Sequence, residues 1–356
     1  MRISLPASRR RALASITGLA AVLGAPRVSA QPRDVTWRMG SSWPTNLPIL
    51  SEAASDFADS VGKASGGRLQ IQVVDPSQHG IPGGLLQAVK EGKFDLAHTT
   101  AHYYAKEVPA IDFFTTIPFG LTADENHAWL NFGGGQQLFE SVLAPHGILP
   151  LTAGNTSVQF GGWFQKEIRS PADLKGVRMR ISGFPGQVIG RLGAVPVELP
   201  IGKIAQAFED KQIDAAEAVV PALDALIPFE KHAPLQYGPW HEPDAALHLF
   251  VDSAKFAALP ADLQQLVRQV AQAAALRSIA RGLHQNAPAL RAMEARGAIA
   301  RPWPPSVLAA LHQATADEIA SVSDPDARRV AASLLAYKAR VARYSVDTIG
   351  AVLATR

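Results

Sequence analysis

Two twelve-residue stretches of the chain read alike: QAVKEGKFDLAH at residues 87–98 and QAFEDKQIDAAE at residues 206–217. Each places a helix-forming segment before a polar turn, and a strand-like segment with Asp after an apolar residue follows. The four identities indicate either an internal repeat or chance, because helix-turn-strand units share composition. A true repeat predicts two similar lobes, with the strand of each ending at the edge that faces the other lobe.

The segments before the first stretch indicate the fold class. Apolar and polar residues alternate at 35–39 and at 69–73, and apolar residues recur at helical spacing between Leu50 and Val61. This strand-helix-strand order predicts an α/β fold in which most strands pair in parallel.

Helical patterns dominate the C-terminal third of the chain. Pro260 opens a stretch whose apolar stripe continues to about Glu294, and two further helices are expected at 306–321 and 326–349. The helix that begins after Pro260 is long enough to pack across both lobes and to brace them.

The first thirty residues predict an export signal. A basic segment of twin-arginine appearance contains Arg9, Arg10 and Arg11, and it precedes an apolar run at 13–23 and small residues at 28–30. The apolar run is too short to span a bilayer. We therefore expect export to the periplasm by the twin-arginine route, removal of residues 1–30 and a mature protein that begins at Gln31.

The charge of the mature chain excludes one class of partner. The 356 residues carry a formal net charge of +3, but the signal holds five Arg and no acidic residue. The mature chain therefore has 29 Lys and Arg against 31 Asp and Glu, without a basic block, so no nucleic-acid partner is expected. Without cysteine, neither a disulfide nor a thiol nucleophile is available.

Motifs for catalysis are missing from the sequence. It contains no Gly-x-Ser-x-Gly elbow, no His-Glu-x-x-His, no glycine-rich phosphate loop and no Cys/His cluster. The pair His241-Glu242 is followed by Pro243, which prevents a helix from presenting a second metal ligand one turn later. We expect a binding protein rather than an enzyme, and an exported hydrolase or lyase stays the alternative.

The stretch VRMRISG at residues 177–183 predicts a ligand-binding arginine. Val177, Met179 and Ile181 alternate with Arg178 and Arg180 in a strand that breaks at a glycine. In open α/β sheets, ligands bind beyond the carboxyl ends of the strands, so the second arginine is placed to reach a cleft. Its guanidinium offers a planar fork that matches a carboxylate, whereas Arg178 is expected to form a surface salt bridge.

A second candidate is the acidic residue at the end of the strand 213–216. Glu217 would repel an anionic ligand in the same cleft unless a cation lies between them or Arg180 dominates. The side-chain oxygen of Gln159 and main-chain carbonyls would give such a cation an oxygen shell, which selects Na⁺ or Ca²⁺ over zinc. Each of these residues is also compatible with a helix cap or a solvent-exposed position.

Several segments together resemble the DctP-type periplasmic solute-binding proteins of TRAP transporters, and among them the branch that binds 2-oxo acids and related monocarboxylates. The resemblance covers nearly the whole mature chain. It rests on the order and spacing of residues 92–98, 159–164, 173–180, 191–200, 213–217 and 240–243.

The resemblance implies a type II-like, two-lobed α/β binding protein, with a long helix bracing both lobes and further C-terminal helices. It assigns the ligand carboxylate to Arg180. It also implies a Na⁺ or Ca²⁺ ion that bridges to the ligand and is held by the side chains of Gln159 and Glu217 and by the carbonyl of Ala218. Asn155 and one of two adjacent tyrosines, with Tyr103 favoured, are implied as further pocket residues.

The sequence departs from this branch inside the site. The branch usually has Trp after the glutamate, and this chain has Ala218. A main-chain carbonyl survives the change, but the loss of an indole wall enlarges the pocket and changes which acid fits.

The expected organisation and partners follow from the resemblance. We expect lobe I at 31–154 and about 244–262, lobe II with the bracing helix at 155–243 and about 263–325, and a helical extension at 326–356. The expected partners are a small carboxylate and the membrane subunits of a TRAP transporter. A homodimer through the C-terminal helices is a further expectation, and a receptor that feeds a sensor kinase is a second alternative.

Overall fold

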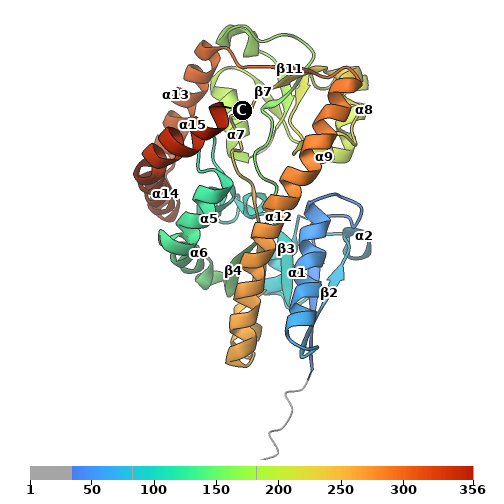
Figure 1. The fold of residues 1–356 in the computed structure, drawn as a ribbon, viewed down its shortest axis with the longest axis vertical. Coiled ribbons are helices and arrows are strands. Elements are labelled where there is room, and N and C mark those ends of the chain that lie inside the picture. The colour runs from blue at the N-terminus through green and yellow to red at the C-terminus, as the bar shows by residue number, and fades with distance from the viewer. Residues whose placement is uncertain (1–33, 82, 182, 356) are drawn as a thin grey trace, which may run out of the picture. The chain divides into compact units, whose positions relative to one another are not determined.

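The chain forms two β-sheets with helices packed around them (Figure 1). The computed structural model describes residues 34–81, 83–181 and 183–355, so the predicted export signal lies outside the described residues. The first sheet has the order β2-β1-β3-β10-β4, and the second sheet has the order β11-β9-β5-β8-β6-β7. The strands of the first sheet are β1 (Val35–Ser41), β2 (Leu69–Val74), β3 (Leu96–Thr99), β4 (Ile148–Asn155) and β10 (Ala246–Asp252). The strands of the second sheet are β5 (Gly162–Phe164), β6 (Arg178–Arg180), β7 (Val195–Val197), β8 (Ala215–Ala216), β9 (Leu235–Tyr237) and β11 (Ile299–Arg301).

Both sheets are mixed, so the expectation of mainly parallel strands is only partly right. Strand β1 pairs in parallel with β2 and β3, but β10 runs antiparallel to β3 and β4. In the second sheet, β6 pairs in parallel with β7 and β8, but β5 runs antiparallel to β8 and β9. The antiparallel strands β5 and β10 are the first strands after the chain crosses from β4 to the second sheet and from β9 back to the first; a third crossing, from β10 to β11, runs through α12.

The helices follow the predicted pattern closely. The long helix predicted from Pro260 is α12 (Ala261–Ala295), and the two helices after it are α13 (Pro305–Ser321) and α14 (Pro325–Tyr344). The other helices of six or more residues are α1 (Leu50–Ala64), α3 (Leu85–Lys90), α5 (Ala123–Phe132), α6 (Gly135–Leu143), α7 (Gly183–Arg191) and α8 (Ile204–Glu209). The shorter ones are α2 (Pro76–His79), α4 (Asp112–Thr115), α9 (Pro221–Asp224), α10 (Phe229–His232), α11 (Ser253–Ala257) and α15 (Ala351–Ala354).

The two similar stretches adopt the same local structure. The first forms α3, a turn and β3, and the second forms α8, a turn and β8. The shared aspartate makes the same contact in both, because Asp95 Oδ2 accepts the backbone N–H of Arg38 at 2.6 Å and Asp214 Oδ2 accepts that of Arg178 at 3.0 Å. These matching hydrogen bonds support an internal repeat over chance similarity.

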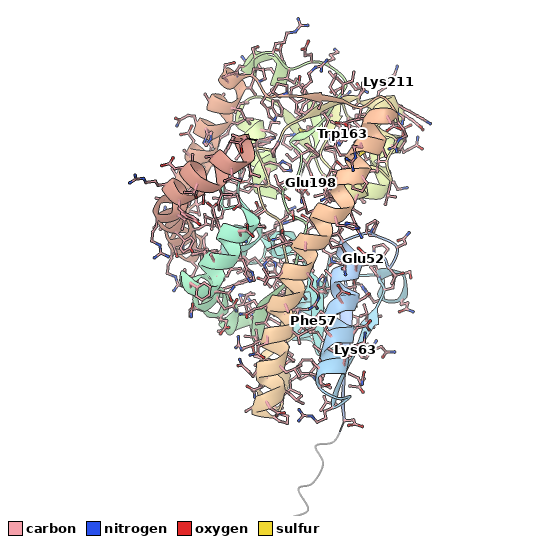
Figure 2. All side chains as sticks on the ribbon, viewed as in Figure 1. Glu52, Phe57, Lys63, Trp163, Glu198 and Lys211 are labelled. Carbon is pink, nitrogen blue, oxygen red and sulfur yellow. The ribbon has the colours of Figure 1, made fainter. Side chains whose placement is uncertain are left out.

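Helix α12 lies across both sheets, as predicted, and passes along α1 at one end and α9 towards the other (Figure 1). Its residue Val267 belongs to the buried cluster of Phe57, and its residue Met293 belongs to the buried cluster of Trp163. Phe57 lies on α1 and Trp163 on β5, and Figure 2 labels both. One helix therefore contributes to the apolar core beside each sheet.

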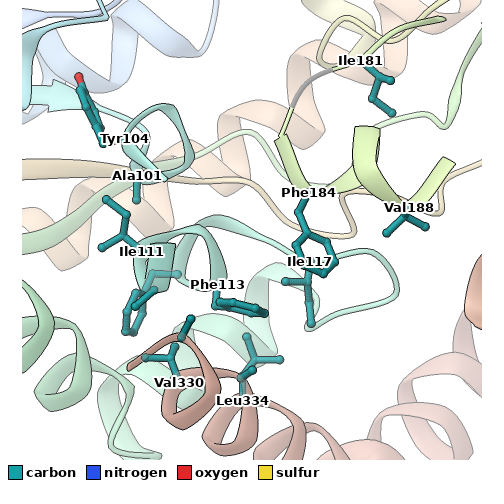
Figure 3. Packing of buried hydrophobic residues seen from close by; sticks show 14 of the residues in the cluster. Ala101, Tyr104, Ile111, Phe113, Ile117, Ile181, Phe184, Val188, Val330 and Leu334 are labelled. Atoms are coloured by element: carbon teal, nitrogen blue, oxygen red, sulfur yellow. The ribbon is translucent and has the colours of Figure 1, made fainter. Parts of the chain in front are cut away.

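Helix α14 packs onto its own chain. Val330 and Leu334 are buried in the same apolar cluster as Ile111 and Phe113 (Figure 3). Trp129 Nε1 on α5 donates a hydrogen bond to Ser333 Oγ at 3.1 Å. The predicted extension therefore contributes to the core through α14, and the predicted limits of the two lobes stay a prediction.

Within the described residues, every helix is too short or too polar to cross a lipid bilayer.

A close approach of backbone segments beside the second sheet generates a prediction. A Cβ atom at Gly161 would lie 2.3 Å from the carbonyl oxygen of Gly238 and 2.5 Å from Cδ1 of Trp240. We expect Gly161→Ala to destabilise the protein by about 1–3 kcal/mol, because neighbouring backbone has to move. The control is Gly202→Ala, where an added Cβ meets no atom within 4 Å. Equal melting temperatures of the two variants in calorimetry would contradict this expectation.

Candidate functional site

A cavity lies where the carboxyl ends of β6 and β8 meet segments of the first sheet. Its free volume is about 60 Å³, room for a small molecule of a few water-sized groups. The second-sheet side contributes Arg180, Ile181, Ile201, Glu217, Ala218 and Val219. The remaining lining residues are Trp43, Leu50, Thr100, His102, Tyr103, Thr156, Gln159, His241, Glu242, Ala245 and Leu247.

Parallel pairing of β6 and β8 brings Arg180 and Glu217 together. Arg180 ends β6 opposite Ala216, and the backbone N–H of Glu217 donates to the Arg180 carbonyl at 2.9 Å. Nη1 of the arginine then donates to Glu217 Oε2 at 2.8 Å and to the Glu217 carbonyl at 2.7 Å, while Nε donates to the Leu199 carbonyl. The two side chains are 11% and 8% exposed, so this ion pair is largely shielded from water.

The neighbouring arginine has the surface role expected of it. Arg178 makes a two-point salt bridge to Asp214, with Nε to Oδ2 at 2.9 Å and Nη2 to Oδ1 at 2.7 Å. Its side chain is 41% exposed and does not line the cavity. Arg178 and Arg180 lie on the same face of β6, so their different surroundings come from their positions along the strand. Arg180 ends the strand and lines the cavity, whereas Arg178 begins it and pairs with Asp214 at the surface.

Gln159 lies in the crossing between β4 and β5, and its amide is oriented by neighbours. Nε2 donates to Thr156 Oγ1 at 3.1 Å, and the backbone N–H donates to the Glu242 carbonyl at 2.9 Å. The side-chain oxygen is buried and has no hydrogen-bond partner among the described residues. A buried amide oxygen in this state suits a ligand or a cation.

The structure does not bring Asn155 to the cavity. Its amide nitrogen donates to Asp244, and its Oδ1 accepts the backbone N–H of Ser157 at 2.6 Å. Ser278 on α12 holds its backbone from the other side, donating to its carbonyl at 2.7 Å and accepting from its N–H. Asp244 also accepts from Asn126. Asn155 therefore fixes the crossing points of the chain between the two sheets, where its neighbours use its whole hydrogen-bonding capacity.

Tyr103 does reach the cavity, from the short helix η1 (Ala101–Tyr104). Its side chain is 44% exposed, and its ring lies 5.7 Å from that of Trp43, with an angle of 56° between the planes. The adjacent Tyr104 is buried and hydrogen-bonds through its OH to Thr99 Oγ1, so it is the core member of the pair.

Three lining residues with histidine or carboxyl side chains were missed by the sequence reasoning. These are His102, His241 and Glu242. The last two were set aside because Pro243 excludes a helical metal motif, although they belong to a segment that carries the family resemblance. His241 Nε2 lies 3.9 Å from Glu217 Oε1, and neither ring nitrogen of this buried histidine has a hydrogen-bond partner among the described residues.

Burial controls the protonation of several groups in and around the cavity. It raises the pKa of Glu242 well above its usual range, and the nearby Glu217 adds to this effect. Burial lowers the pKa of His102 to about 4. His102 is therefore uncharged near neutral pH, and the raised pKa of Glu242 favours its protonated form, which reduces the negative charge that an anionic ligand meets.

The donor set is compatible with a hard cation. Glu217 offers a carboxylate, Gln159 offers its partnerless amide oxygen, and Ala218 at the cavity wall adds a main-chain carbonyl. Among the described residues, this site included, no group of three or more His, Cys, Asp or Glu could hold a metal ion, so a cation here would depend on amide and main-chain oxygens beside Glu217. An oxygen set with one acidic residue suits Na⁺ or Ca²⁺ and not zinc.

The fold and the site define a periplasmic-type binding protein, and comparison with known families makes the assignment specific. The chain matches bacterial extracellular solute-binding protein family 7 (DctP) over residues 39–324, and it belongs to this family. Members of this family are transport receptors and not enzymes.

Individual relatives in this family are similar to the chain over most of its length. A monocarboxylate 2-oxoacid-binding periplasmic protein of Nostoc sp. is 35% identical over 302 residues, which are 84% of this chain and 82% of the relative. A TRAP periplasmic solute-binding protein of Colwellia psychrerythraea, crystallised with calcium and pyruvate, has a TM-score of 0.88 at 34% identity and covers 91% of this chain and 100% of its own. A TRAP solute-binding protein of Bordetella bronchiseptica, a mixed-occupancy dimer with calcium and picolinate, has a TM-score of 0.84 at 31% identity and covers 90% and 96%.

Buried Asp112 generates a pH prediction. Burial raises its pKa from 3.8 to about 7, so the folded state holds a proton that the unfolded chain releases at lower pH. Its stabilising effect is complete below about pH 4 and is lost as the pH rises through about 7, a difference of about 4 kcal/mol. We expect Asp112→Asn to raise the melting temperature at pH 8 and to leave it unchanged near pH 4.

The control for this pH dependence is Asp59→Asn, which removes an exposed carboxyl group from α1. Its melting temperature should follow that of the unmodified protein at both pH values. A pH-independent effect of Asp112→Asn would contradict the assignment of a buried, protonated carboxyl group.

Proposed function

We propose that this receptor captures a small 2-oxo acid or a related monocarboxylate and delivers it to the membrane subunits of a TRAP transporter. The observation that carries the proposal is the placement of Arg180, the only Arg or Lys among the described residues that line the cavity. Its Nη2 group has no hydrogen-bond partner among the described residues, so one arm of the fork is free for a carboxylate oxygen. The relatives that bind monocarboxylates support this ligand class.

Capture proceeds by closure of two lobes about the crossings of the chain. We assign lobe I to residues 31–154 and about 244–262, and lobe II with α12 to 155–243 and about 263–325. Asn155 and Asp244 hydrogen-bond at two of the crossings, which makes this pair the natural pivot. Arg180 then binds the ligand carboxylate from lobe II, and Tyr103 covers it from lobe I.

A Na⁺ or Ca²⁺ ion completes the site. Gln159, Glu217 and the carbonyl of Ala218 would hold it. When bound, the ion would supply positive charge that offsets the carboxylate of Glu217 beside an anionic ligand. Calcium in two related structures supports this part of the proposal.

Export and assembly complete the proposal. The Arg9 to Arg11 segment directs the chain to the twin-arginine route. Changing these residues to Lys should therefore reduce the amount of protein in the periplasm.

Two copies pair through exposed apolar residues near the C-terminus, namely Tyr344, Val346, Ile349, Val352 and Leu353. The dimeric relative supports pairing, and a monomeric mass in light scattering at micromolar concentration would refute it.

The two arginines of β6 give a matched test of ligand binding. We expect Arg180→Ala to abolish the rise in melting temperature caused by pyruvate, because the carboxylate loses its only cationic side chain. Arg178→Ala should keep the rise, because it removes a surface contact to Asp214. Equal losses in both variants, measured by thermal shift, would refute the assignment of the carboxylate to Arg180.

The cation generates a separate prediction. We expect Ca²⁺ to increase the pyruvate-induced rise in melting temperature, and Gln159→Ala to remove this increase, because one oxygen ligand is lost. The control is Gln206→Ala, which removes an exposed amide on α8. A calcium effect of full size in Gln159→Ala would exclude this residue as a ligand of the ion.

A further inference from the structure

The cavity has an apolar half opposite in character to the Arg180 half. Trp43, Leu50 and Leu247 line it beside Ala218 and Val219. Four of these residues belong to one buried apolar cluster that joins segments of the first sheet to the loop after β8, namely Trp43, Leu50, Val219 and Leu247. A ligand gripped at its carboxylate by Arg180 therefore meets hydrocarbon at its other end.

Trp43 is the largest side chain of this apolar half and is held in place. It is 5% exposed, its backbone N–H donates to Ser41 Oγ at 3.1 Å, and its indole Nε1 donates to His98 Nδ1 at 3.0 Å. The ring of Tyr103 packs against it. The indole plane is therefore fixed before a ligand arrives, which favours ligands of matching shape.

His98 can serve as a permanent hydrogen-bond acceptor. It lies in β3 with no exposed surface, and burial lowers its pKa to about 4. Its Nδ1 therefore carries no proton near neutral pH and accepts the indole N–H. In the repeat, His98 occupies the position that Glu217 occupies in the second stretch. Each of these paired positions thus fixes one large cavity residue, Trp43 in one lobe and Arg180 in the other.

We propose that Trp43, positioned by His98, is the specificity-determining wall of the site and selects acids whose far end is a short apolar group. This inference rests on the proposed function and names the ligand class within it: 2-oxo monocarboxylates with a small alkyl substituent. The free volume of about 60 Å³ keeps the substituent short.

The same wall rejects two other kinds of acid. A second carboxylate at the apolar end would find no cationic side chain, because Arg180 is the only Arg or Lys among the described lining residues and lies in the opposite half with Gln159 and Glu217. A hydroxyl-rich tail would lose its hydrogen bonds to water against indole and leucine side chains without replacement. Dicarboxylates and sugar acids should therefore bind more weakly than alkyl 2-oxo acids of similar length.

Calorimetric titration with three acids tests the proposal: pyruvate, 3-methyl-2-oxobutanoate and oxaloacetate. Each buried methylene strengthens binding about fourfold and the branched acid has two more carbons than pyruvate, so we expect it to bind about sixteenfold more tightly. Oxaloacetate should bind more weakly than both. In Trp43→Ala the preference for the branched acid over pyruvate should fall to about twofold, while pyruvate affinity changes by less than about threefold.

Variants of His98 separate positioning from general stability. His98→Asn keeps an acceptor near the place of Nδ1 and should retain the preference, whereas His98→Leu removes the acceptor and should lose it. The ratio of two affinities is the readout, because a loss of stability alone weakens both acids alike. Should His98→Leu fail to fold, Trp43→Phe, which keeps a ring but lacks the N–H, should show a reduced preference.

The outcomes distinguish this inference from the proposed function. Binding of pyruvate with an acid preference that Trp43→Ala leaves unchanged would overturn the role of Trp43 and leave the receptor function intact. Tightest binding of oxaloacetate would also overturn it. Failure of all three acids to bind would overturn the proposed ligand class and this inference with it.

Discussion

The balance of buried charge around Arg180 is the constraint on which the site depends. One guanidinium serves the cavity, and it is already paired with Glu217 in an environment largely shielded from water. A buried pair of this kind is held by geometry, and removal of one partner leaves an uncompensated charge. An incoming carboxylate adds a negative charge beside Glu217 and Glu242, and burial together with the nearby Glu217 raises the pKa of Glu242, which favours its uncharged form. A cation in the donor set would offset part of the remaining negative charge.

Much of the architecture could be predicted because it depends on local patterns. The apolar stripe after Pro260 located α12 within a residue, and the end of the strand pattern after Arg180 distinguished this cavity residue from Arg178 at the surface. The direction of β10 could not be predicted, since it depends on where the chain returns from the second sheet. The contact of Asn155 with Asp244 could not be predicted for the same reason, because Asp244 lies 89 residues further along the chain; a ligand-binding role of Asn155 stays a prediction. Similarly, the residues around Trp43 do not predict its contact with His98. The two side chains come close only when β1 pairs with β3.

The internal repeat explains why the cleft has two different halves. In each lobe, the aspartate just before a strand accepts a backbone N–H from the neighbouring strand. Asp95 does so in the first sheet and Asp214 in the second. The residues three positions later have diverged to His98 and Glu217. The repeated framework places both at a strand end facing the cavity region, so one architecture supplies an aromatic wall and an ion pair. Sequence identity alone could not separate this repeat from chance, whereas the matched hydrogen bonds do.

The contacts of α12 have a mechanical consequence. Ser278 grips the backbone of Asn155 at a crossing, and Asn286, eight residues further along the same helix, accepts the N–H of Ala222 at the start of α9 at 3.0 Å. The chain is therefore pinned at two points about 12 Å apart along one rod. Because α12 also contributes to the apolar core beside each sheet, a rotation of one sheet against the other has to carry this helix along or bend it.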